Sequence, residues 1–238
     1  MTLTNDHPRK VILVTGPAGN LGSAVIERLR KETVSLVLLD RHPNRIKECF
    51  PDLEGSKDHL LMTNVDLTDP DLVQTAVNTA LDTFGIIDCL IHTTGGFDMG
   101  EQVHEISLNK WNLMMDINVM TLLHITRSVI PAMVYQKNGT IITIGARPSL
   151  QGKKKMGSYS AAKAALLRLT ESIAAEGSSA GIKARCIIPG TIDTPQNRRA
   201  MPEADRSKWV KPKSIAEIIS ETCMNNDLTE TDVIIPIL

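Results

Sequence analysis

The chain has 238 residues, of which 42% are hydrophobic and 3% aromatic, and its formal net charge is −1. This balance gives no support to a polyanionic partner, and so few aromatic residues argue against a stacking platform for single-stranded nucleic acid. We therefore expect no nucleic-acid partner, and the length suits one α/β domain over residues 1–238.

Strand-like apolar runs alternate with helix-like stretches along the whole chain. The strands are expected at residues 10–15, 35–40, 59–64, 86–92, 140–144, 183–188 and 232–236. The helices are expected at residues 21–31, 70–84, 107–136, 159–177 and 214–224, with Asp69 as the cap of the second. This alternation predicts a single doubly wound, Rossmann-type α/β domain: a mostly seven-stranded parallel sheet with helices on both faces.

Two absences bear on where the protein works. No apolar run approaches the roughly 20 residues that span a bilayer, and the N-terminal segment lacks the apolar core of a secretory signal. We therefore expect a soluble, cytoplasmic protein with no membrane partner. The four cysteines have no metal-ligand spacing, so no metal site is expected.

The turn after the first strand carries Gly16, Gly19 and Gly22. Glycines let the backbone approach a pyrophosphate, and the helix that follows points its first amides at the phosphate. The turn, with Asn20 and Leu21 at the start of the helix, is therefore predicted to bind a nucleotide. A turn that only joins strand to helix is the alternative.

Asp40 ends the second strand, 18 residues after Gly22. A carboxylate there can accept hydrogen bonds from ribose hydroxyls and would repel a 2′-phosphate. The adjacent Arg41 would attract that phosphate, so NADP(H) stays open. The pattern favours NAD(H).

Tyr159 and Lys163 are four residues apart in a predicted helix and therefore lie on one face. An ammonium one turn from a phenol favours the phenolate, so we expect Lys163 to lower the pKa of Tyr159 from its usual value near 10. A tyrosine tuned in this way can act as a proton donor or acceptor. The alternative is a solvent-exposed Tyr–Lys pair with no catalytic role.

Taken in order, several motifs resemble the short-chain dehydrogenase/reductase family over nearly the whole chain. They are Thr15-Gly16-x-x-Gly19-x-x-Gly22, Asp40, Asp66, Gly95, Asn118, Tyr159, Lys163 and Pro189-Gly190 through Thr194. The resemblance implies an NAD(P)(H)-dependent oxidoreductase that moves hydride between nicotinamide and a small carbonyl or alcohol. Tyr159 would be the proton donor or acceptor, Lys163 would bind the nicotinamide ribose, and Asn118 would hold a water.

The same resemblance implies further cofactor contacts and an assembly. The contacts beyond the glycine turn, Asp40 and Arg41 are Asp66, Leu67, Thr94, Gly95, Gly96, Tyr159, Lys163, Pro189, Gly190, Ile192 and Thr194. In this family, the helix with Tyr159 and the long helix before it commonly pair between subunits, so a homodimer or homotetramer is implied.

The chain departs from the family pattern in two places. The usual Asn-Asn-Ala-Gly after the fourth strand is His92-Thr93-Thr94-Gly95, and we expect His92 to be a structural polar residue. The catalytic serine expected 13 residues before the tyrosine is Ala146, which cannot hydrogen-bond a substrate oxygen. Ser149 and Thr143 are the nearby hydroxyls that would have to substitute.

A narrower resemblance, to the dihydropteridine reductase family, fits the alanine. It rests on Gly145-Ala146, on Gly157-x-Tyr159 with Ala162-Lys163, and on the segment from Asp193 to Trp209. It implies a pterin-like substrate and a substrate-binding loop at residues 194–213. The substrate contacts would then be Phe97, Ala146 and Arg198. A dinucleotide-binding sensor or scaffold that has lost catalysis is the alternative, and Ala146 favours it.

Overall fold

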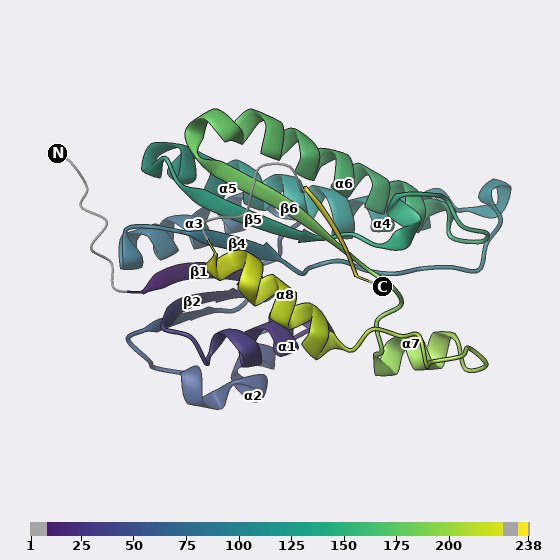
Figure 1. The fold of residues 1–238 in the computed structure, drawn as a ribbon, viewed down its shortest axis with the longest axis horizontal. Helices are drawn as coiled ribbons and strands as arrows, with labels where there is room; N and C mark the ends of the chain where they lie inside the picture. Colours follow the sequence, from purple (N-terminus) through teal and green to yellow (C-terminus); the bar gives the residue numbers. More distant parts are fainter. Residues whose placement is uncertain (1–8, 226–232, 238) are drawn as a thin grey trace.

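The centre of the molecule is a parallel sheet of seven strands (Figure 1). The computed structural model describes residues 9–225 and 233–237. The strands run in the order β3-β2-β1-β4-β5-β6-β7 across the sheet. Their bounds are β1 (Lys10–Thr15), β2 (Val34–Leu39), β3 (His59–Met62), β4 (Cys89–His92), β5 (Gly139–Ile144), β6 (Ile182–Pro189) and β7 (Ile234–Ile237). The predicted doubly wound α/β fold is confirmed.

Helices cover both faces of the sheet, as Figure 1 shows. One face carries α1 (Asn20–Leu29), α2 (Arg45–Cys49) and α8 (Pro212–Met224). The other carries α3 (Pro70–Phe84), α4 (Leu108–Met115), α5 (Thr121–Gln136) and α6 (Gly157–Gly177). The short α7 (Pro195–Ala200) stands apart from both layers, after the end of β6.

The alternation of side chains along β1 explains why the chain needs two cores. Val11 and Leu13 point into a core with α3, α5 and α6, whereas Ile12 and Val14 point into a core with α1 and α8. All four side chains are fully buried. Each contributes about 1.5–3 kcal/mol of hydrophobic stabilisation, which is why the strand sequence is apolar at consecutive positions rather than at alternate ones.

Most predicted boundaries agree with the structure to within a few residues. The Asp69 carboxylate accepts hydrogen bonds from the amides of Asp71 and Leu72, so the predicted cap of α3 is confirmed. The helices α2 and α7 were not predicted, because five and six residues are too few to show a periodic pattern. The predicted start of the last strand at Asp232 lies outside the described residues.

The long helix predicted over residues 107–136 is interrupted by a π-helical turn, Asp116–Met120, between α4 and α5. In the described part of the chain, Leu108–Gln136 is the one helical stretch long and apolar enough, by length and composition, to cross a membrane. However, 56% of its most apolar window is buried inside the domain, and α5 packs against α3. This burial is what a core helix requires.

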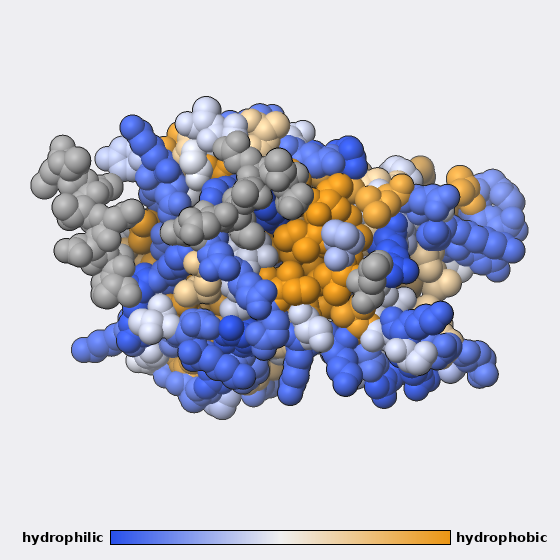
Figure 2. All heavy atoms as spheres, viewed as in Figure 1, coloured by the Kyte–Doolittle hydropathy of each residue, from blue (hydrophilic) through white to orange (hydrophobic). Residues whose placement is uncertain are grey.

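The edge strand β7 leaves apolar side chains near the surface. Figure 2 shows orange, apolar atoms gathered beside β6 and β7 on a face that is otherwise largely hydrophilic. Ile234 and Ile235 are partly buried there. The apolar area therefore follows from the position of β7 at the end of the strand order.

Two glycines with left-handed backbone give a matched test of the fold. Gly85 (φ +74°) and Gly181 (φ +73°) both end helical segments. A Cβ added at Gly85 would have no atom of the described residues within 4 Å, whereas one at Gly181 would lie 2.3 Å from the Lys137 carbonyl oxygen. Gly85→Ala should lower the free energy of unfolding by about 1–2 kcal/mol through left-handed strain alone. Gly181→Ala should lower it by about a further 1–3 kcal/mol through the clash. Urea denaturation measures both, and equal losses would contradict this explanation.

Candidate active site

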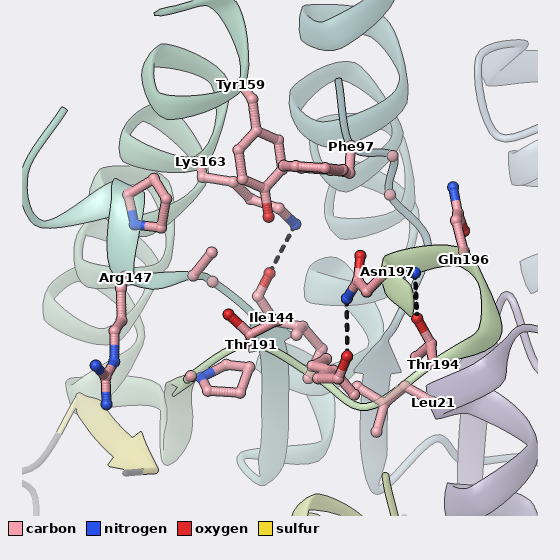
Figure 3. Close-up of a pocket in the computed structure, with 18 of the residues that line it drawn as sticks. Leu21, Phe97, Ile144, Arg147, Tyr159, Lys163, Thr191, Thr194, Gln196 and Asn197 are labelled. Carbon is pink, nitrogen blue, oxygen red and sulfur yellow. Dashed lines mark hydrogen bonds between the residues drawn. The ribbon is translucent and has the colours of Figure 1, made fainter. Parts of the chain in front are cut away.

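Two adjoining cavities open at the carboxyl ends of the strands, where open α/β sheets bind their ligands. The first has a volume of about 320 Å³ and the second about 340 Å³. Both are lined by Thr93, Gly95 and Gly96, which follow β4, so the two form one depression. Figure 3 shows the first cavity.

Most of the predicted cofactor and substrate residues line this depression. On the first cavity are Asn20, Leu21, Gly95, Gly96, Phe97, Ala146, Tyr159, Lys163, Pro189, Gly190, Ile192 and Thr194. On the second are Gly16, Gly19, Asp40, Arg41, Asp66, Leu67, Thr94, Gly95 and Gly96. Three predicted residues line neither cavity: Gly22, Asn118 and Arg198.

The glycine turn has the geometry of a phosphate cradle. Gly16 has a positive φ of 65°, and a Cβ on Gly22 would lie only 2.2 Å from the Gly16 carbonyl oxygen. Gly22 therefore lets the helix return close to the strand rather than lining the cavity. Among the residues that the structure describes, no side chain caps α1, whose N-cap is Gly19. Its first-turn amides are therefore available to a bound anion.

The second cavity has a polar edge made by the ends of β2 and β3. One oxygen of Asp40 accepts a hydrogen bond from the His42 amide at 2.9 Å. The amide and hydroxyl of Thr68 both donate to Asp66, and these bonds hold the pKa of Asp66 below its ordinary value. His42 and Arg45 also line this edge. Neither was predicted, although each follows Asp40 within five residues in the printed sequence.

Lys163 lies at the bottom of the first cavity, one helical turn beyond Tyr159 on α6, as predicted. Its ammonium donates a hydrogen bond of 2.8 Å to the carbonyl oxygen of Ile144 at the end of β5. Figure 3 shows the Tyr159 hydroxyl and this ammonium on the same side of the cavity. A Cβ on Gly95 would lie 3.2 Å from the Lys163 nitrogen and 2.8 Å from the Asn118 side-chain oxygen. The absence of a side chain at Gly95 thus brings lysine and asparagine together.

Asn118 is buried in the π-helical turn and clamps the backbone of Gly96. Its Oδ1 accepts from the Gly96 amide at 3.2 Å, and its Nδ2 donates to the Gly96 carbonyl at 3.2 Å. Nδ2 also donates to the Met114 carbonyl at 3.0 Å. The asparagine therefore lies behind the cavity wall and fixes the loop that follows β4.

Burial sets the protonation of both Tyr159 and Lys163. It raises the pKa of the phenol to about 12 and lowers the pKa of the ammonium to about 8. The rings of Tyr159 and Phe97 meet at 90°, with their centroids 5.0 Å apart. The prediction that Lys163 lowers the pKa of Tyr159 is wrong for the protein alone, because desolvation of the phenolate dominates. At pH 7 both groups carry their proton.

Neither of the two hydroxyls expected to substitute for the serine, Thr143 and Ser149, is free to do so. Ala146 lines the first cavity, but the Thr143 hydroxyl is buried and bonded to the Thr170 hydroxyl at 2.8 Å. The Ser149 hydroxyl donates to the Ala146 carbonyl oxygen at 2.6 Å. Neither Thr143 nor Ser149 lines the cavity, whereas Thr191 does.

The predicted substrate loop, residues 194–213, closes one side of the first cavity with Thr194, Gln196, Asn197 and Met201. The Thr194 hydroxyl caps α7 by accepting from the Asn197 amide, and the Asn197 side chain donates to the Ile192 carbonyl (Figure 3). Gln196, Asn197 and Met201 were not predicted individually, although the predicted loop contains them.

Arg198 does not reach the cavity. Its guanidinium forms two hydrogen bonds to the Asp193 carboxylate, at 2.6 and 2.8 Å, outside the cavity lining. The substrate contact of Arg198 stays a prediction, and in the structure the arginine is paired within its own loop.

Comparison with known proteins agrees with this geometry. The family model described as short chain dehydrogenase matches residues 10–205. A Staphylococcus saprophyticus protein named as an uncharacterized oxidoreductase is 31% identical over 209 residues, which cover 87% of this chain and 88% of that protein. The chain belongs to the short-chain dehydrogenase/reductase family.

Solved structures share the fold. Levodione reductase superposes with a TM-score of 0.85 at 23% identity, covering 96% of this chain and 95% of that one. The protein ElxO, solved with NADP bound, superposes with a TM-score of 0.85 at 22% identity, covering 96% and 97%.

The buried ammonium of Lys163 should make the free energy of unfolding depend on pH. The pKa of Lys163 is about 8 in the folded protein, whereas its ordinary value, expected in the unfolded chain, is 10.5. Between pH 8 and pH 10.5 the unfolded chain therefore binds more protons than the folded protein. The free energy of unfolding of the wild type rises with pH over this range. Lys163→Met removes this penalty. The variant should be more stable than wild type by up to about 3 kcal/mol at pH 7, and by little near pH 10.5.

Urea denaturation between pH 7 and 10.5 measures this difference. Lys208→Met, which replaces an exposed lysine, is the control and should show no comparable pH dependence. A gap between Lys163→Met and wild type that stays constant with pH would contradict the assignment.

Proposed function

We propose that the protein is an NAD(P)H-dependent reductase of a small carbonyl or pterin-like substrate, with Tyr159 as its proton donor. The observation that carries the proposal is the grouping of Tyr159, Lys163 and Asn118 around Gly95, next to the glycine turn. The name of the Staphylococcus saprophyticus relative, an oxidoreductase, supports the same reaction class.

The depression fits a dinucleotide. The Gly16–Gly22 turn and the uncapped start of α1 would hold the diphosphate, and the Asp40 edge would hold the adenosine end. Lys163 and the Pro189–Thr194 segment would border the nicotinamide end. When bound, the nicotinamide supplies or accepts the hydride.

Tyr159 supplies the proton. With a pKa of about 12, its phenol is protonated at neutral pH and can donate from its oxygen to the substrate atom that gains electrons. The Lys163 ammonium then stabilises the tyrosinate that remains, since an opposite charge nearby favours the ionised form. Asn118 fixes the loop of Gly95 and Gly96 against which the reacting groups lie.

The alanine at position 146 bears on the substrate. Ala146 offers no hydroxyl to a carbonyl oxygen, so Tyr159 and other polar residues of the lining, such as Thr191 and Gln196, would orient the substrate. The apolar side chains of Phe97, Met156 and Met201 would hold it by shape. A pterin-like substrate takes its proton at nitrogen and does not need the missing hydroxyl. Oxidation of NADH with quinonoid dihydropterin and with a panel of small ketones separates the two substrate classes.

A dinucleotide-binding sensor is the second candidate, and Ala146 is the observation that favours it. Tight NADH binding without turnover of any member of the panel would support the sensor. Turnover of any member would exclude it.

The two tyrosines of the chain provide a matched pair for testing the proton donor. Tyr159→Phe keeps the ring against Phe97 but removes the acid, so kcat should fall by about 10²- to 10⁴-fold. NADH affinity should stay within about twofold, because the hydroxyl contributes little ground-state binding. Tyr135→Phe alters an exposed residue of α5 and should leave kcat unchanged. Turnover retained in Tyr159→Phe would remove Tyr159 from the mechanism.

We further propose that Asp40 makes NAD(H) the preferred cofactor, with NADP(H) as the alternative because ElxO was solved with NADP. Removing the carboxylate should relieve repulsion of the 2′-phosphate. Asp40→Ser should therefore raise the ratio of kcat/KM for NADPH to that for NADH by about tenfold or more.

Arg41→Ala is the companion variant, because it removes the neighbouring cation and should lower that ratio. The proposal fails if wild type prefers NADPH and Asp40→Ser leaves the ratio unchanged.

A further inference from the structure

His92 is buried at the end of β4 and touches two elements that meet behind the site. Its Nδ1 lies 3.0 Å from the Thr15 hydroxyl, and its Nε2 lies 3.4 Å from the Thr121 hydroxyl. The side chain is fully buried, and burial together with the Lys163 ammonium lowers its pKa to about 3. The ring is therefore neutral, with one nitrogen donating and the other accepting.

The neighbouring hydrogen bonds fix the direction of this chain of contacts. The Thr121 hydroxyl donates to the Ile117 carbonyl oxygen at 3.0 Å, so its oxygen accepts from the Nε2–H of His92. Nδ1 is then the acceptor, and the Thr15 hydroxyl donates to it. The protons run in one order, from Thr15 through His92 and Thr121 to Ile117, and every member is satisfied.

The two ends of this chain lie at the two halves of the site. Thr15 directly precedes Gly16, and its carbonyl oxygen accepts a 2.7 Å hydrogen bond from the Thr93 hydroxyl. Thr121 directly follows the π-helical turn Asp116–Met120, and the chain ends on Ile117 within that turn. Asn118, the next residue, clamps Gly96.

We propose that His92 is a positioning residue. Its Nε2–H holds Thr121, and with it the π-helical turn and Asn118, in place against the end of β4, while the Thr15 hydroxyl fixes the tautomer of the ring. The catalytic part of this inference rests on the function proposed above. A shift of the turn displaces Asn118 from Gly96, and misplacements of this kind lower kcat more than they lower cofactor affinity.

Two substitutions separate the contacts of the ring. The amide group of asparagine is as many bonds from Cα as Nδ1, so His92→Asn keeps the Thr15 contact and loses Thr121. The amide group of glutamine is as many bonds from Cα as Nε2, so His92→Gln keeps Thr121 and loses Thr15. Each variant gives up one buried hydrogen bond, so their thermal unfolding midpoints should fall by similar amounts.

The turnover of NADH, measured with the most active ketone or quinonoid dihydropterin, should then differ between His92→Asn and His92→Gln. His92→Asn should lower kcat by about 10- to 100-fold. His92→Gln should keep kcat within about threefold of wild type, and both should bind NADH within about threefold of wild type. Thr121→Val should reproduce the loss seen in His92→Asn, and the double variant should lose no more than either single one. Equal losses of kcat in His92→Asn and His92→Gln would overturn the proposal.

A readout without turnover keeps the positioning role distinct from the proposed reaction. In ¹⁵N NMR spectra of the wild-type protein, His92 should show the neutral tautomer with the proton on Nε2. The side-chain amide signals of Asn118 should shift in His92→Asn and stay in place in His92→Gln. Unchanged Asn118 signals in both variants, or a proton on Nδ1, would overturn the role of His92 even if the enzyme is active. Absence of turnover in wild type with the expected signals would count against the proposed function alone.

Discussion

The charge that Lys163 carries into the interior is the constraint on which the rest of the site depends. Its hydrogen-bond acceptor is the carbonyl oxygen of Ile144, a dipole rather than an anion. This bond does not neutralise the positive charge, so its field in a poorly solvated region is available to other groups. Together with burial, which is the larger cause, it lowers the pKa of His92. The ammonium also lies beside Gly95, where an added Cβ would come within 3.2 Å of the Lys163 nitrogen. A carboxylate in place of the Ile144 carbonyl would bind the ammonium more strongly. It would also neutralise the positive charge that stabilises a phenolate.

Much of the architecture could be predicted from the sequence, because burial on both faces leaves a plain signal. Consecutive apolar residues in β1 and the glycine spacing after it indicate a parallel sheet with a tight glycine turn, and the structure has both. The spacing of Tyr159 and Lys163 also predicts that they share one face of a helix. These features depend on local periodicity, which one chain displays directly.

Other features depend on surroundings that periodicity does not encode. The pKa of Tyr159 is raised because of how much protein surrounds the phenol, and a four-residue spacing carries no information about that. Arg198 is held by Asp193, five residues earlier, in a conformation that α7 imposes. The π-helical turn at Asn118 lies within an apolar pattern that reads as one continuous helix. The sequence does show that Ala146 lacks a hydroxyl, but only the structure shows that Thr143 and Ser149 are already engaged.

The π-helical turn determines which way the side chains of α5 face relative to those of α4. A π-helical turn winds one extra residue into a helix, and each residue of an α-helix turns the chain by about 100°. Losing that residue would leave a smooth helix but would rotate everything after it by more than a quarter turn. The apolar stripe of α5, which includes Leu122, Ile125 and Val129 in the core, would then point away from the sheet. The irregular turn thus corrects the rotation of the helix about its axis. Asn118 can face the site while the apolar side chains of α5 still pack against the sheet.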